Sequence, residues 1–274
     1  MDYSRSTASS DFYRLLTEAV AEFAEYGFTS MERVDYWSQR IREAAFAALV
    51  PQPVLEAELR SALTTAYRRE VDLGHILKRH KGVPTFELDK IKPRLRNELD
   101  RRIMASANLI KLNRTEAIGN TLRRFQGWAT SIPPGGSDAV DKVQTKQNIR
   151  KALASLPFEE RRVAIDQAHK LVSDISDIVA NDNGAIAGEW ESNWRQRNYD
   201  YREEHKERDR KVYLIRGTWA VQRRLVKAGP AGFMDEITRP GEEVFCRCRY
   251  RYLYDLDQLP ANMLTAAGLA ALRK

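Results

Sequence analysis

The chain has 274 residues, of which 43% are hydrophobic and 30% are charged, and its formal net charge is +7. No apolar run approaches the roughly 20 residues that a membrane-spanning helix needs, and the start lacks the apolar segment of a secretory signal. Two cysteines are too few for a disulfide framework. We therefore expect no membrane insertion, synthesis in a reducing cytoplasm, and one large domain or two ordinary ones.

The N-terminal region, residues 1–93, is expected to be helical. Apolar side chains recur with helical spacing over residues 12–23, 34–45 and 55–67. Each stripe of this kind would form the buried face of one helix. The helical faces of this region would also suit the docking of a partner protein.

A second region, residues 94–274, opens with further helices. The apolar pattern predicts a long helix, or two in tandem, over 94–129, and two more helices within 139–180, the second starting at Pro157. Between them, residues 131–138 contain two prolines and two glycines, which break a helix. This segment is either a linker between domains or a loop.

The last part of the chain changes character. Residues 211–220 and 244–254 are rich in β-branched and aromatic residues, which is typical of strands. Residues 195–256 are therefore predicted to form a basic α+β part, followed by a tail over 257–274. The predicted fold class is α+β, with a mostly helical first two-thirds and a small basic C-terminal domain.

The excess of positive charge lies in this C-terminal part. Residues 195–251 hold 15 Lys and Arg against 9 Asp and Glu, whereas the rest of the chain is nearly neutral. Such a segment suits a polyanion, and double-stranded DNA would be bound through its phosphates without sequence readout. The alternative is a solvated surface without a partner. The candidates for contact with DNA or an acidic partner are Arg208, Arg210, Lys211, Arg223, Arg224, Arg247, Arg249 and Arg251.

Both cysteines stand in the last predicted strand. Alternation along a strand places on one face Val244, Cys246, Cys248, Tyr250, Tyr252 and Tyr254. The arginines between them point to the opposite face. Neighbouring residues on one face of a strand lie about 6.5–7 Å apart at Cα, at or beyond the usual limit for a disulfide. We expect both thiols to be buried structural groups without a disulfide between them.

A metal site at these thiols is the alternative to simple packing. Thiolates and imidazole bind zinc, and His205 is the nearest histidine, with Asp200 or Asp209 as a further ligand. A usual zinc site has two separate pairs of Cys or His, whereas this chain has one Cys-x-Cys pair and one histidine nearby. We expect no cofactor, and zinc bound by His205, Cys246 and Cys248 stays the alternative.

Catalytic motifs are mostly absent from the sequence. It contains no glycine-rich phosphate loop, no G-x-S-x-G nucleophile elbow and no H-E-x-x-H motif. A nucleophilic pair of Cys246 or Cys248 with His205 fits by residue type, but its spacing does not favour it over packing. We therefore expect a protein that is not an enzyme.

The order of these elements resembles a known family. Two stretches of the chain are "YDYREEHKERD" and, about thirty residues later, "RPGEEVFCRC". Together they resemble the C-terminal signature of the phage Mu F-like minor head proteins, also called phage head morphogenesis proteins. Upstream, the R-T-E helix of that family is similar to "NRTEAIGN". The resemblance covers about residues 108–270. The matching residues are Arg114, Thr115, Glu116, Asn120, Trp194, Arg202, His205, Asp209, Pro240, Gly241, Glu242, Cys246, Arg247 and Cys248.

Two departures from the family pattern stand out. The family's Asp–Gly after the histidine is Asp209–Arg210 here. The C-x-x-C that precedes the histidine in some members is missing. Because those cysteines would be the other two ligands, their absence argues against a complete zinc site.

The resemblance implies a structural role in a tailed bacteriophage. Such proteins are minor head components that associate with the portal or capsid interior during assembly and DNA packaging, and some are thought to travel with the DNA. The implied partners are portal, capsid or scaffold proteins and double-stranded DNA, in the host cytoplasm during assembly and then in the virion head. Two alternatives stay open: an enzyme acting on nucleic acid or the cell envelope through His205 and Asp209, and a nucleic-acid-binding module unrelated to phages.

Overall fold

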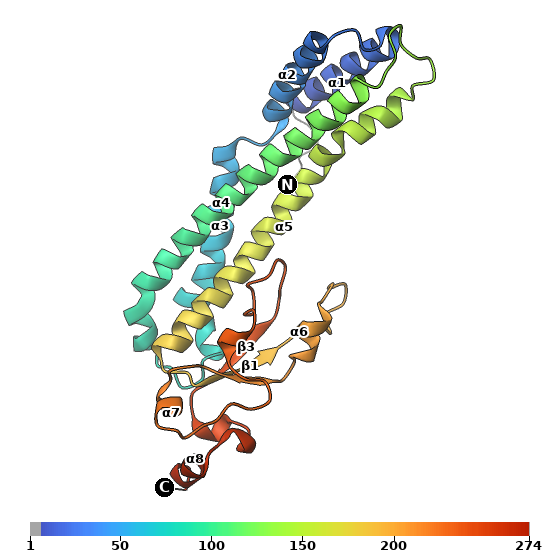
Figure 1. The fold of residues 1–274 in the computed structure, drawn as a ribbon. Coiled ribbons are helices and arrows are strands. Elements are labelled where there is room, and N and C mark those ends of the chain that lie inside the picture. Colours follow the sequence, from blue (N-terminus) through green and yellow to red (C-terminus); the bar gives the residue numbers. More distant parts are fainter. Residues whose placement is uncertain (1–6, 274) are drawn as a thin grey trace. The chain divides into compact units, whose positions relative to one another are not determined.

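The computed structural model describes residues 7–273. It is mostly helical, with a small three-stranded antiparallel sheet near the C-terminus, which confirms the predicted α+β class (Figure 1). Within the described residues, every helix is too short or too polar to cross a membrane.

The chain divides into two compact units, each made from two stretches of sequence. The first unit comprises Met1–Leu59 and Met104–Val163, and the second comprises Arg60–Ile103 and Ala164–Lys274. This division differs from the boundary predicted at residues 93 and 94. A single boundary assumes that each domain is one continuous stretch of sequence. Here, two long helices each contribute one stretch to the first unit and another stretch to the second unit.

The first unit is all helical. Its core consists of apolar side chains at helical spacing, among them Phe23 and Phe125, whose rings meet edge to face with centroids 5.8 Å apart. Burying each large side chain of this kind stabilises the unit by about 1.5–3 kcal/mol. The helices that contribute to it are α1 (Thr7–Tyr26), α2 (Met31–Ala48), α3 (Gln52–Tyr67), α4 (Thr85–Ala129) and α5 (Lys142–Asp182).

Each of the two long helices continues through a proline near which the sequence predicted the start of a helix. Helix α4 begins at Thr85 rather than at residue 94, and α5 runs unbroken through Pro157, where a second helix was expected to start. A proline inside a helix costs about 3 kcal/mol. Apolar burial on both sides of Pro157 opposes this cost, because Leu156 and Val163 are buried, and Glu160 is paired with Arg114, Oε1 to Nε 2.5 Å.

The segment 131–138 is a packed loop of the first unit and not a domain linker. The backbone N–H of Gly135 donates to the carbonyl of Tyr26 at 3.0 Å. At Gly136 the backbone has φ +81°, and a Cβ there would lie 2.2 Å from the carbonyl oxygen of Glu25. The glycines therefore allow the loop to close against the end of α1.

The second unit is built around the small sheet. Its strands, in the order β2-β1-β3, are β1 (Ala187–Glu191), β2 (Val212–Leu214) and β3 (Arg249–Leu253). The central strand, β1, was not predicted, and it lies before residue 195, where this part was expected to start. The strand expected over 211–220 is shorter, because the turn at Gly217 leads into a helix.

Short helices complete the second unit, together with parts of α3, α4 and α5. The α-helices are α6 (Glu203–Glu207), α7 (Trp219–Gln222) and α8 (Ala266–Ala271). A π-helical turn spans Arg68–Asp72, and 3-10 helices span His75–Lys78, Met234–Glu236, Leu256–Gln258 and Ala261–Met263. The predicted tail, 257–274, belongs to this fold, because Leu259 and Met263 are buried in its core.

Buried side chains cover both faces of the sheet. One face is mainly aromatic and includes the cysteines; its residues are Trp190, Tyr213, Cys246, Cys248, Tyr250 and Tyr252. The other face is aliphatic and includes Ala187, Leu214, Leu253 and Met263. Val244 was predicted to share the aromatic face, but it is 58% exposed. The reason is that pairing begins only at Arg249 and Phe245 has φ +60°, which interrupts the alternation.

Candidate functional site

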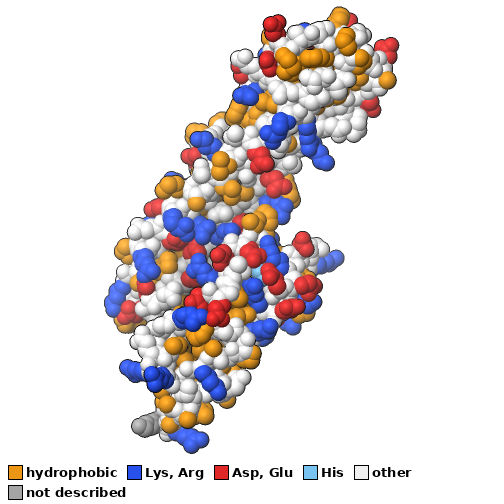
Figure 2. Space-filling view, in the orientation of Figure 1, with side chains coloured by type: hydrophobic (Ala, Val, Ile, Leu, Met, Phe, Trp, Pro, Cys, Tyr) orange, Lys and Arg blue, Asp and Glu red, His pale blue; other side chains and the backbone are white. Residues whose placement is uncertain are grey.

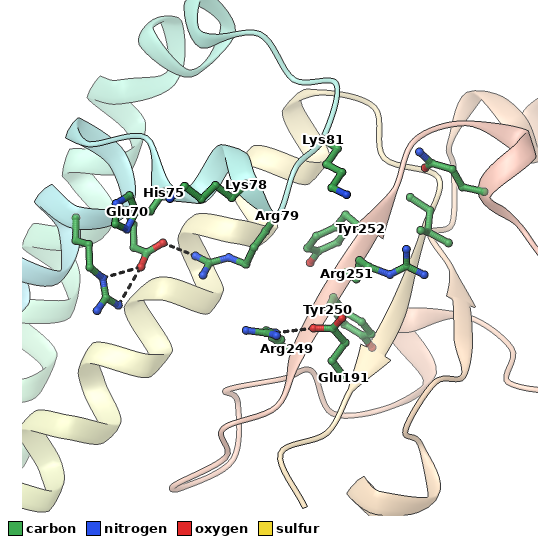
Figure 3. A pocket seen from close by; sticks show the side chains of 13 residues that line it. Glu70, His75, Lys78, Arg79, Lys81, Glu191, Arg249, Tyr250, Arg251 and Tyr252 are labelled. Atoms are coloured by element: carbon green, nitrogen blue, oxygen red, sulfur yellow. Dashed lines mark hydrogen bonds and ion pairs between the residues drawn. The ribbon is translucent and has the colours of Figure 1, made fainter. Parts of the chain in front are cut away.

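The second unit contains a basic pocket of about 760 Å³, between the segment from Arg69 to Lys81 and strand β3 (Figure 3). Its walls carry two carboxylates, Glu70 and Glu191. The lining also contains six basic residues, four more than the number of carboxylates. These basic residues are Arg69, Lys78, Arg79, Lys81, Arg249 and Arg251.

A buried carboxylate shapes the first wall of the pocket. Glu70 is only 2% exposed and accepts hydrogen bonds from Arg69, Nε to Oε1 3.1 Å, and from Arg79. A buried charge is stable only when it is paired, so Glu70 fixes both guanidinium groups. Gly74, at φ +66°, turns the chain between the π-helical turn and the 3-10 helix that holds Lys78.

The second wall is a charge ladder on β3 and its neighbour β1. Arg249 Nε lies 2.5 Å from Glu191 Oε2, and Arg251 pairs with Glu189. Both arginine side chains are more than half exposed, so each pair contributes only about 0–1 kcal/mol. These weakly held guanidinium groups can still bind an anion from solution.

Lys78 and Lys81 supply charge that the fold leaves uncompensated. Both are exposed, and among residues 7–273 neither has an acidic partner within 4.0 Å. Figure 3 shows Lys81 projecting into the space between the two walls. The pocket is therefore suited to a phosphate or another polyanion.

The structure brings only part of the predicted DNA-binding set to this pocket. Arg249 and Arg251 line it, whereas Arg247 lies over the Tyr199 ring, 5.3 Å from its centroid. On the face shown in Figure 2, basic and acidic side chains are interspersed rather than separated into one basic surface. The other candidates lie elsewhere: Arg208 stacks on Trp190, Arg210 pairs with Glu189, Arg223 lies over Trp219, and Lys211 and Arg224 are exposed.

The cations of the first wall were not among the residues predicted to bind an anion. The stretch "RREVDLGHILKRHK" holds five Lys and Arg against two acidic residues, which was a local signal. It was overlooked because the charge of the whole chain outside 195–251 is nearly balanced.

The second notable cluster joins His205 of α6 to the two cysteines. His205 Nδ1 lies 3.7 Å from Cys246 Sγ and 3.7 Å from Cys248 Sγ. All three residues are buried, with exposures of 1%, 1% and 6%, and both cysteines are free. On its other side, His205 Nε2 lies 3.5 Å from Glu243 Oε2. These three side chains could hold a soft metal ion.

The two thiols affect each other's ionisation. The hydrogen bond from Cys248 lowers the pKa of Cys246 to about 6, although burial opposes the shift. The same hydrogen bond, together with burial, raises the pKa of Cys248.

Three further residues of the family-like motif make contacts in the same part of the second unit. Asp209 accepts from the backbone N–H of Ser192 at 2.8 Å and from Trp194 Nε1 at 3.1 Å. Arg202 Nε lies 2.7 Å from Glu243 Oε2. Because the Asp209 oxygens are directed at Ser192 and Trp194, Asp209 and His205 do not face a common substrate position.

The remaining motif residues have structural contacts. The carbonyl of Pro240 accepts from Ser173 Oγ at 2.5 Å, and at Gly241, with φ +81°, a Cβ would lie 2.9 Å from that of Ser173. The residues of the upstream motif belong to the first unit. Arg114 forms the buried ion pair with Glu160, and Glu116 is exposed. Asn120 accepts a hydrogen bond from Arg123.

Comparisons of the chain with protein-family models, with curated proteins and with solved structures found no match.

Proposed function

We propose that the chain is a structural minor head protein of a tailed bacteriophage. It would associate with the portal or the capsid interior during head assembly and DNA packaging, and contact DNA through phosphates. It would act in the host cytoplasm during assembly and then reside in the virion head. The sequence resemblance to the phage Mu F-like minor head proteins suggests this role.

One observation carries the proposal: several motif residues of the second unit are in contact, namely His205 with both cysteines, and Asp209 with Trp194. Residues up to 43 positions apart meet where His205 contacts Cys248. Asp209 holds Trp194, and Arg202 holds Glu243 next to His205. A chance match of short motifs has no reason to bring its residues together, so their contact supports the resemblance.

The basic pocket supports the part of the proposal that concerns DNA. A duplex carries one negative charge per about 1.7 Å of its axis, so several phosphates can meet a pocket with an excess of four positive charges. The tyrosines in its lining, Tyr250 and Tyr252, are buried and offer no free ring for base stacking. Binding through phosphates alone predicts affinity without sequence preference.

Charge reversal in the pocket tests the contact with DNA. K78E/K81E should weaken binding to every duplex alike and reduce the slope of log K against log salt by about 1.8, equal to two phosphate contacts. The matched control, K111E/K142E, makes the same change in net charge at two exposed lysines of the first unit. Fluorescence anisotropy with labelled duplexes over a salt series would measure both.

Three results would contradict this contact. They are an affinity independent of salt, an affinity restricted to one sequence, and an equal loss in the control variant. The head role needs a separate test, because DNA binding without it would describe a nucleic-acid-binding module unrelated to phages. The protein should co-purify in low copy with portal or procapsid particles. Its absence from both assembling heads and mature virions would refute the head role.

The alternative of an enzyme using His205 and Asp209 has less support. Asp209 is directed at Ser192 and Trp194, and His205 is 1% exposed between the thiols and Glu243. An acid–base pair must reach the same substrate. This arrangement favours a structural use of both residues.

A further inference from the structure

We infer that His205, Cys246 and Cys248 bind one Zn²⁺ ion, through the Nδ1 atom of the histidine and the two Sγ atoms. This site does not depend on the proposed role in a phage head. It reverses the expectation from the sequence, which favoured packing because it showed one cysteine pair and one nearby histidine.

The distances from the imidazole nitrogen to the two sulfur atoms fit a tetrahedral ion. With Zn–S of about 2.3 Å and Zn–N of about 2.0–2.1 Å, tetrahedral angles place sulfur and nitrogen about 3.6 Å apart. His205 Nδ1 lies 3.7 Å from each Sγ atom. All three atoms lie within 4.8 Å of one another. The ligands are thus already spaced for the ion.

The far side of the imidazole is arranged for the same purpose. Glu243 Oε2 lies 3.5 Å from His205 Nε2, and that carboxylate is held by Arg202 Nε at 2.7 Å and by Thr238 Oγ1 at 3.2 Å. His205 Nε2 makes no hydrogen bond in this structure, but the nearby negative charge favours the tautomer with its proton on Nε2, which leaves the Nδ1 lone pair facing the thiols. Metal-binding histidines are usually oriented by such a partner.

An ion on the Nε2 side is disfavoured. His205, Glu204 and Glu243 also lie close enough together to bind a cation. However, Glu243 is already paired with the Arg202 guanidinium, whose positive charge would repel a second cation. The thiol side has no such cation among the contacts of the two cysteines, so the ion belongs there.

The chemistry of the ligands selects zinc. Two thiolates balance the charge of Zn²⁺, so the complete site is neutral and compatible with burial, and the thiol protons leave to solvent when the ion binds. Sulfur and imidazole ligands in tetrahedral positions suit zinc better than magnesium or calcium. Among the described residues, no other His, Cys, Asp or Glu joins this group of three, so a water would complete the coordination.

The expected role of the ion is structural. It would join α6, which carries His205, to the segment that leads into β3. All three ligands are buried, so a substrate has no direct approach to the ion.

Metal analysis of the full chain tests the site. Protein purified without chelator should contain about one zinc per chain, and replacement by Co²⁺ should give the intense visible absorption of tetrahedral cobalt with thiolate charge-transfer bands. C246A, C248A and H205A should each lose the bound metal. E243Q should weaken zinc affinity by about 10- to 100-fold, because Glu243 orients the imidazole. The control H169A, at an exposed histidine of the same unit, should retain it.

The wild-type measurements keep the test decisive even if a variant fails to fold. Folded wild-type protein that holds less than about 0.1 zinc per chain after incubation with Zn²⁺, and shows no tetrahedral cobalt spectrum, would overturn the inference. An octahedral cobalt spectrum without charge-transfer bands would do the same, because it would place the ion on carboxylates. Zinc retained by folded C246A/C248A would also exclude the site.

Discussion

The two units of this protein are stabilised in different ways. The core of the first unit is a set of apolar side chains on α1, α2, α4 and α5, such as Phe23 and Phe125. The second unit buries more polar groups, including Glu70, Asp177 and His205. The pocket and the thiol–imidazole cluster both belong to the second unit.

Polar contacts in the second unit connect α5 to the C-terminal part. Asp166 accepts from the backbone N–H of Phe245 at 2.6 Å, and Asp177 accepts from Arg239 Nη1 at 2.9 Å. Buried networks of this kind fix one arrangement but are costly when a partner is removed. The comparison shows that an apolar helical core stabilises the first unit, whereas the second unit combines apolar packing with buried polar pairs.

The largest expected effect is a truncation in the apolar core of the first unit. F125A should lower the free energy of unfolding by about 3–5 kcal/mol, because Phe125 is fully buried and the cavity would not fill. F46A removes a phenylalanine that is 53% exposed and should change it by less than about 0.5 kcal/mol. Urea unfolding would measure both. Equal losses would mean that apolar burial does not stabilise this unit.

A pH-dependent effect is expected in the second unit. Burial, with a smaller contribution from Arg79, lowers the pKa of His80 from 6.5 to about 3. The ring lies between Tyr254 Oη at 2.5 Å and Ser176 Oγ at 2.9 Å, stacked on Tyr252. Below pH 6.5 the unfolded state binds a proton that the folded state does not, so stability falls as pH drops towards about 3.

The variant H80N separates the contribution of His80 from that of other acid-sensitive groups. The free energy of unfolding should fall by up to about 1.4 kcal/mol per pH unit below pH 6.5. The total loss at pH 4.5 should be about 2–3 kcal/mol. H80N removes this titration and should flatten the curve of unfolding free energy against pH below 6. Parallel curves for the wild type and H80N would show that His80 does not titrate as expected.

The smallest effect concerns the basic pocket. K78E/K81E should change the free energy of unfolding by no more than about 0.5 kcal/mol, because both lysines are exposed and lack an acidic partner among the described residues. Thermal unfolding alongside the DNA measurement would check this. A large loss of stability would mean that the lysines support the fold, and that weaker DNA binding is indirect.

Elements whose pattern repeats over many residues could be predicted from the sequence. Helical spacing predicted the helices of the first unit, and alternation correctly placed Cys246, Cys248, Tyr250 and Tyr252 on a buried face. These patterns are readable because a helix or strand repeats its buried face at a fixed period. Strand β1 was missed because its five residues, "AGEWE", are too few to show a period clearly.

The continuation of helices and the contacts between distant side chains depend on tertiary packing. Pro157 is typical of a helix start, but α5 continues through it, with Leu156 and Val163 buried on either side. The basic pocket joins the segment around Lys78 to Arg251, which lies far along the chain. His205 reaches Cys246 across 41 residues, with Nδ1 turned to the thiols. Sequence spacing encodes local periodicity, whereas contacts between distant residues depend on how the packed elements bring them together.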